Sequence, residues 1–321
     1  MPSDHPQVLS DSDDIGLFRQ SWWLDATAGQ RGWGEARVEE GGRLVALLRF
    51  AVRKRLGFTF LEMPPLTQTL GPWFTPLEGK PSQVLAREKD LVEQLVARLP
   101  AHDHFAQNMS TATPNWLPWH WLGYSQTTRY TYTLDLTQGE KALWDGFLPK
   151  VRTDARKAAS RFGLEVKSDL GIDAFIAVQN LTFARQGIKT PVSDAIIKRV
   201  DAACAQRACR KIFFAVDAQQ RVHAAAYLVW DAERAYYLMG GGDPELRNSG
   251  ATSLVLWEAI RFATGVARIF DFEGSMREPV ERFVRGFGAI QVPYHRVWRS
   301  PSRSIGMARG LADAARSLLA R

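Results

Sequence analysis

The stretch from Tyr236 to Met276 decides the fold: it runs YYLMGGGD at 236–243, RNSGAT at 247–252 and, after an apolar run, IFDFEGSM at 269–276. Apolar residues recur at helical spacing between the last two segments, at Leu256, Ala259, Ile260 and Ala263. The pattern predicts a strand, a glycine-rich turn, a helix and a second strand, which is typical of an α/β unit.

The glycine-rich turn is a candidate anion site. Glycines let backbone amides approach a ligand, because no Cβ stands in the way. The free N–H groups at the start of the following helix favour a phosphate, and Arg247 and Thr252 add side-chain donors. The alternative is that the glycines only serve a tight turn. The candidate cofactor-binding residues are Met239, Gly240, Gly241, Arg247, Asn248, Ser249, Gly250, Ala251 and Thr252.

Two carboxylates follow in the second strand. Asp271 and Glu273 are two residues apart, so an extended strand places both on one side of the sheet. A phosphate site beside two carboxylates suggests an enzyme that holds a phosphorylated donor.

Three blocks of the sequence follow patterns known from one enzyme superfamily. Arg247, Gly250 and Thr252 occupy the positions of the signature Arg/Gln-x-x-Gly-x-Gly/Ala, and Thr252 departs from its small final residue. FDFEGSM and ERFVRGFG lie in order within 270–288, and the basic segment 148–157 precedes them. In these blocks the chain resembles the GNAT acyltransferase superfamily and, within it, the branch of the Fem-type peptidyltransferases (FemAB/FemX-type).

The resemblance covers residues 125–298 and implies an α/β (α+β) fold. Residues 34–63 and 211–239 each predict three antiparallel strands, and each set is followed by a loop, a helix and a further strand. We therefore expect two tandem GNAT-like lobes, 1–137 and 138–321, each a mixed, largely antiparallel sheet flanked by helices. The second lobe is expected to carry the donor site and a C-terminal helix.

The resemblance also implies a reaction, transfer of an acyl group from acyl-CoA, such as acetyl-CoA, to an amine. Such a reaction needs aligned reactants, a neutral amine and a hydrogen bond to the oxyanion. Exposed amides near 239–241 could supply that hydrogen bond. Asp271 or Glu273 could take the amine proton, and Tyr237 could protonate the leaving group or be only a half-buried strand residue. Candidate substrate-binding cations are Lys150, Arg152, Arg156, Arg282 and Arg285.

Two other functions remain open. One is transfer of an aminoacyl group from a charged tRNA to a peptide or cell-wall precursor, for which Fem enzymes often carry a long helical arm. The sequence predicts no helix of that length, which favours acyl-CoA. The other is a non-catalytic module that binds nucleic acid or another anion. The acceptor is expected to be a small-molecule or peptide amine.

Composition fits a cytoplasmic enzyme. The 321 residues carry a net charge of +7, concentrated in 141–161 and 295–321, which suggests an anionic ligand or surface. Neither a signal-like start nor an apolar run of about 18 residues is present, so no membrane span is expected. His102 and His104 lack a third ligand nearby and are expected in a surface loop, and no metal site is predicted.

Overall fold

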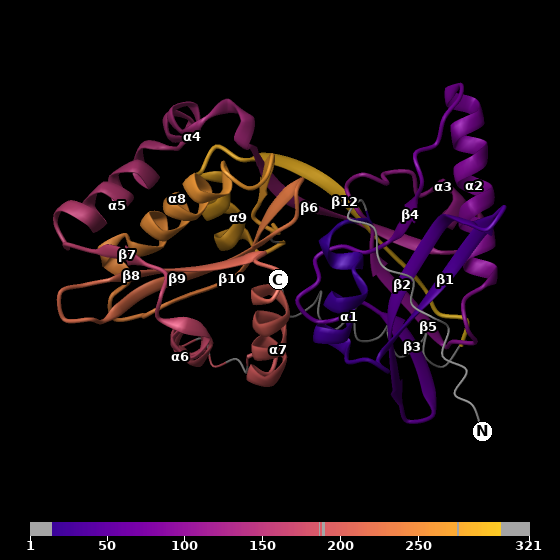
Figure 1. Cartoon of the computed structure of the whole chain (residues 1–321), viewed down its shortest axis with the longest axis horizontal. Helices are drawn as coiled ribbons and strands as arrows, with labels where there is room; N and C mark the ends of the chain where they lie inside the picture. Colours follow the sequence, from indigo (N-terminus) through magenta and orange to yellow (C-terminus); the bar gives the residue numbers. More distant parts are fainter. Residues whose placement is uncertain (1–14, 186, 188–189, 275, 303–321) are drawn as a thin grey trace. The chain divides into compact units, whose positions relative to one another are not determined.

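The computed structural model describes residues 15–185, 187, 190–274 and 276–302. The chain divides into two compact units, drawn in Figure 1: Met1–Arg129 with Pro293–Arg321, and Tyr130–Val292. The lobe boundary near residue 137 stays a prediction. The C-terminal helix expected at the end of the second lobe lies outside the described residues.

The first unit is built on a mixed, mainly antiparallel sheet in the order β1-β2-β3-β5-β12, with β4 paired to β2. Only β3 and β5 run parallel. Its elements are η2 (Leu17–Arg19), α1 (Ser21–Ala28), β1 (Trp33–Glu40), β2 (Arg43–Arg55), β3 (Phe58–Glu62), β4 (Pro72–Phe74), α2 (Pro81–Ala97), β5 (His104–Asn108) and α3 (Leu117–Trp121). The last strand, β12 (Ile290–Arg299), joins β5 through Arg296–Arg299.

An apolar cluster packs α2 and α3 against the sheet of this unit. Leu91 and Leu95, one turn apart on α2, are buried together with Phe50 of β2, Phe105 of β5 and Trp119 of α3. Phe105 stacks on Trp119 with ring centroids 5.7 Å apart. The spacing of apolar residues on α2 therefore explains why this helix covers the sheet.

One expectation fails in this unit. His104 is fully buried at the start of β5, and its Nδ1 lies 2.8 Å from Ser300 Oγ. The prediction of a surface loop for this residue was wrong, because its neighbours in the sheet come from segments remote in sequence.

The second unit repeats this plan. Its strands run β7-β8-β9-β10-β11-β6, antiparallel except for β10 and β11. The elements are β6 (Ser125–Asp135), η3 (Leu136–Gln138), α4 (Glu140–Gly146), α5 (Pro149–Ser160), β7 (Glu165–Lys167), α6 (Gly171–Arg185), α7 (Asp194–Ala205), β8 (Arg210–Val216), β9 (Val222–Trp230), β10 (Arg234–Gly242), η4 (Arg247–Ser249), α8 (Ala251–Ala263), β11 (Ile269–Asp271) and α9 (Glu278–Arg285).

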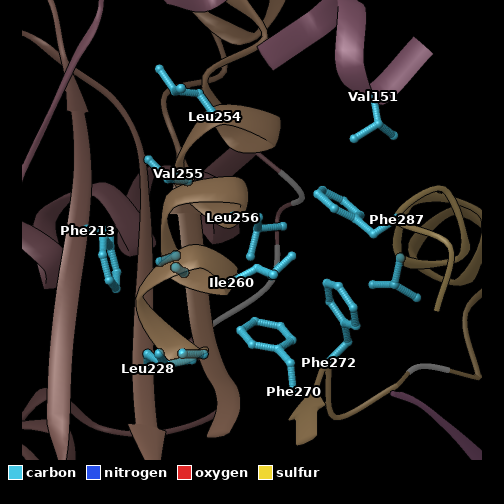
Figure 2. Packing of buried hydrophobic residues seen from close by; sticks show 14 of the residues in the cluster. Val151, Phe213, Leu228, Leu254, Val255, Leu256, Ile260, Phe270, Phe272 and Phe287 are labelled. Carbon is cyan, nitrogen blue, oxygen red and sulfur yellow. The ribbon is translucent and has the colours of Figure 1, made fainter. Parts of the chain in front are cut away.

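Helices cover both faces of this second sheet, α8 with α5, α4 and α9 on one face and α6 with α7 on the other (Figure 1). In Figure 2, Leu256 and Ile260 of α8 lie beside Phe270, Phe272 and Phe287 in the larger core cluster. On the opposite face, Tyr227 of β9 packs edge-on against Phe175 of α6, 5.5 Å between centroids. Strand β9 is buried almost throughout, as expected for a strand covered on both faces.

The predicted fold class is confirmed: each unit has three antiparallel strands, then a helix and a further strand that lies parallel to the third. One local prediction is wrong. Strand β11 ends at Asp271, and Glu273 has a positive φ of 57°. Glu273 therefore lies outside the strand, and strand alternation does not put the two carboxylates on one side of the sheet. Gly274 follows with a φ of 59°, and the chain turns there.

Candidate functional site

The candidate site begins where β10 leaves β11. The parallel pairing covers only Arg234–Tyr236, opposite Ile269–Asp271, whereas β10 remains paired with β9 as far as Gly242. The register with β9 slips between Tyr237 and Met239, which marks a bulge. Beyond Tyr236, therefore, the β11 side of β10 takes no part in the ladder, and its backbone groups there can serve a ligand.

The glycines of β10 have packing reasons of their own. A Cβ at Gly240 would lie 1.8 Å from Tyr237 Oη, and one at Gly241 would lie 2.7 Å from Gln179 Cα on α6. The Gly242 amide donates to Thr182 Oγ1 at 2.9 Å. The structure thus gives the run of glycines a role in close packing, in addition to any role in binding.

The start of α8 is open. Gly250 adopts a left-handed conformation, φ 83°, and a Cβ there would lie 2.3 Å from the carbonyl oxygen of Asp154 on α5. No side-chain cap closes the helix, and only a long 3.4 Å contact joins the Ala251 amide to Ser249 Oγ. Thr252 and Arg247 are exposed beside this helix start. Free amides and a nearby cation are the groups that bind phosphate at helix N-termini.

Helix α5 braces this segment. Lys157 Nζ donates to the carbonyl oxygen of Asn248 at 2.7 Å, which fixes η4 just before α8. Ser249 is buried, and its hydroxyl donates to the Leu246 carbonyl at 2.8 Å. Contacts within the chain therefore hold the segment that carries Arg247 in place.

Most of the predicted substrate-binding cations are exposed, and three of them form ion pairs or ring contacts within the chain. Lys150 pairs with Asp154 at 2.9 Å, and Arg285 pairs with Glu281 at 3.1 Å. Arg156 lies over the Trp144 ring, 5.3 Å from its centroid. The other two candidates are Arg282, which is exposed, and Arg152, which is half-buried.

Asp271 is a buried, fully used acceptor. Its Oδ2 receives Arg234 Nη1 at 2.7 Å, and its Oδ1 receives the Thr131 hydroxyl and, at 2.8 Å, the Glu273 amide. Only 1% of Asp271 is exposed. Both oxygens are occupied by donors, so this geometry favours a positioning role that fixes the turn at Glu273.

Glu273 has the opposite character. Its Oε1 is buried and has no hydrogen-bond partner. Burial raises the pKa of this carboxyl well above 4.5, and the charge of Asp271 raises it further. A Cβ at the next residue, Gly274, would lie 2.2 Å from the Tyr130 carbonyl oxygen, so a glycine is required to make the turn. A buried carboxyl oxygen without a partner, on a group whose pKa is raised, is a candidate for proton transfer.

Tyr237 is half-buried on β10, and burial raises its pKa to about 12. A phenol with a raised pKa keeps its proton at neutral pH and can donate a hydrogen bond. This suits the orientation of a reacting group better than a full proton transfer.

Two absences hold for the described part of the chain. No group of three or more His, Cys, Asp or Glu side chains is arranged to hold a metal ion there. Nor is any helix within it long and apolar enough to cross a membrane.

Sequence reasoning missed Arg234 and Thr131. Both are far from Asp271 in sequence, and only the pairing of β11 with β10 on one edge and β6 on the other brings them to it. Arg234 could have been found only through the strand order, since nothing in its immediate sequence marks it.

Comparison with known proteins agrees with this geometry. Residues 148–278 match the model of the acetyltransferase (GNAT) domain, so the expected GNAT resemblance is confirmed. The match includes α5, the glycine segment of β10, the start of α8 and β11. No curated protein matches the chain significantly.

Solved structures share the fold across both units. FemX superposes with a TM-score of 0.67 at 13% identity, covering 88% of this chain and 94% of FemX. L-PGS from Bacillus licheniformis gives 0.53 at 11% identity, over 93% and 95%. A tandem GNAT protein from the clavulanic acid biosynthesis pathway gives 0.50 at 13% identity, over 84% and 83%. The Fem-like, tandem arrangement of the fold is therefore confirmed.

Proposed function

We propose that this chain is an N-acyltransferase that moves an acyl group from acyl-CoA to an amine. The observation that carries the proposal is that the matched GNAT domain contains an open helix start, a strand edge without a ladder partner, and the unpaired Oε1 of Glu273. Each supplies one requirement of acyl transfer: a donor site, an oxyanion donor and a base.

The chain's residues divide the work as follows. Arg247 and the first amides of α8 hold the phosphates of the donor, since these groups are exposed and a helix start favours anions. An amide of Met239–Gly241 on the edge of β10 away from β9 faces the carbonyl and stabilises the oxyanion as the amine nitrogen bonds to carbon. Glu273 takes the amine proton, directly or through water, and the bond from carbon to the donor's sulfur breaks.

Glu273 suits the role of base better than Asp271. Asp271 is neutralised by Arg234 and bonded on both oxygens, while Glu273 keeps a buried oxygen free. A raised pKa makes the ionised carboxylate of Glu273 a stronger base. Asp271 then acts through Glu273, by holding its amide and raising its pKa.

The test is a turnover assay with a panel of acyl-CoA donors and primary amines. Release of the free thiol measures the reaction. The proposal expects thiol release that requires both the amine and Glu273, with Glu278→Gln, an exposed carboxylate on α9, as the matched control. Binding of acyl-CoA without any turnover across the panel would leave a binding module and overturn the assignment.

A second candidate is transfer of an aminoacyl group from a charged tRNA to a peptide or cell-wall precursor. The exposed cations Lys150 and Arg156 on α5 and Arg282 on α9 support it, because a tRNA needs an extended basic surface. Turnover with aminoacyl-tRNA, salt-sensitive and reduced by Arg156→Gln, together with no acyl-CoA turnover, would favour this candidate over the first.

A further inference from the structure

Two hairpins of the first unit have the same type of tight turn but different residues in it. Gly41 and Gly42 join β1 to β2 with φ values of 57° and 77°, and Leu56 and Gly57 join β2 to β3 with 50° and 80°. Positive φ at both central residues defines a type I′ turn, which favours Gly-Gly and Asn-Gly. Gly-Gly follows this rule, and Leu-Gly does not.

Leu56 is an unfavourable residue for the fold. A leucine at positive φ is strained, because its Cβ crowds the backbone. The side chain is 85% exposed, so it regains nothing from burial. A strained residue whose side chain makes no stabilising contact in the fold points to a role in binding another molecule.

The strand that leads to Leu56 is basic. Arg53, Lys54 and Arg55 are all exposed. Arg53 pairs with Glu62 at 2.7 Å and lies over the Phe60 ring. Within the described part of the chain, no acidic side chain pairs with Lys54 or Arg55.

The first hairpin gives the contrast. Glu39 and Glu40 lead into Gly41, and Arg43 follows Gly42. This turn has no apolar side chain at its apex, and acidic residues approach it. The apolar apex with a basic approach therefore belongs to the β2–β3 turn and is no general property of the hairpins in this unit.

We propose that the tip of the β2–β3 hairpin, residues 53–57, docks onto an anionic phospholipid surface. Lys54 and Arg55 meet the charged headgroups, and Leu56 enters the boundary of the acyl chains. An apolar apex suits a lipid surface better than a nucleic acid, which needs hydrogen-bond donors or aromatic rings for its phosphates and bases. Two free cations and one leucine make this a weak, reversible contact. It does not depend on the proposed acyltransferase activity.

The experiment is co-sedimentation of the full chain with vesicles of phosphatidylcholine alone and of phosphatidylcholine with phosphatidylglycerol. Only the anionic vesicles should bind, less so at high salt. Lys54→Gln with Arg55→Gln should weaken binding about 25-fold, at roughly fivefold per cation. Leu56→Asn should weaken it roughly tenfold, since it removes the inserted group. Because asparagine tolerates positive φ, this variant should melt no lower than wild type.

Arg43→Gln is the matched control, since it removes one exposed cation from the other hairpin and should leave binding within about twofold. Unchanged binding in both the double variant and Leu56→Asn would overturn the proposal. A loss of binding to nucleic acid in the double variant, with vesicle binding unaltered, would also overturn it and assign the basic strand to that partner instead.

Discussion

The helix that follows the third strand starts differently in the two units. In the first, α2 begins with Pro81, which has no N–H, and Gln83 Oε1 accepts the Lys80 amide at 2.9 Å. In the second, α8 begins after Gly250 with no side-chain cap. The two units share the same order of strands, but they differ at the helix that follows. The start of α2 is capped by groups of the chain, and the start of α8 has no side-chain cap.

The strand before each helix shows the same contrast. Strand β3 ends at Glu62 and is followed by Met63, Pro64 and Pro65, whereas β10 continues through three glycines beyond its parallel pairing. Free amides cost stability unless something binds them. This contrast supports the proposal that the donor binds to the second unit.

The largest expected effect is on catalysis. Glu273→Gln keeps the shape of the side chain and removes its ability to take a proton. We expect kcat to fall by roughly 10²–10⁴, the usual range for general acid–base catalysis. Steady-state kinetics on an identified amine should show donor affinity nearly unchanged. Glu273→Gln with full turnover would mean that positioning alone carries the reaction.

Next in size is the effect on donor binding. Arg247→Ala removes an exposed cation beside the open start of α8, and we expect a loss of about 1.5–3 kcal/mol in acyl-CoA binding, the range for a hydrogen bond to a charged group. Calorimetry measures this directly. Arg268→Ala is the control, because Arg268 is exposed and makes a weak ion pair with Glu233, with 4.0 Å between the charged atoms. Equal losses in both variants would indicate general charge attraction and no specific site.

A smaller effect concerns stability. Because the folded state raises the pKa of Glu273, it binds the proton more tightly than the unfolded chain does. Stability from this group is therefore present below about pH 4.5 and is lost as pH rises toward the folded-state pKa, with a slope of about 1.4 kcal/mol per pH unit. Glu273→Gln should raise the melting temperature at pH 8 more than at pH 5. An equal change at both pH values would contradict the raised pKa.

The sequence predicted three antiparallel strands, a helix and a further strand in each half, and it predicted the position of α8, because these elements follow from apolar periodicity and from glycines. It could not separate Asp271 from Glu273. Their difference depends on Arg234 and Thr131, which reach Asp271 through strand pairing, and on the positive φ at Glu273, which ends β11 early. The packing roles of Gly240 and Gly241 were also out of reach, since Tyr237 and α6 are in contact with them only in the folded chain.

Hydrogen exchange with and without saturating acyl-CoA tests the contrast between the two helix starts most directly. We expect slower exchange at amides 239–241 and 251–252, beside the open start of α8, and no change at the amides of residues 80 and 82–84, at the closed start of α2. Protection at 80 and 82–84, or binding without protection at 251–252, would contradict the assignment of the donor site to the second unit.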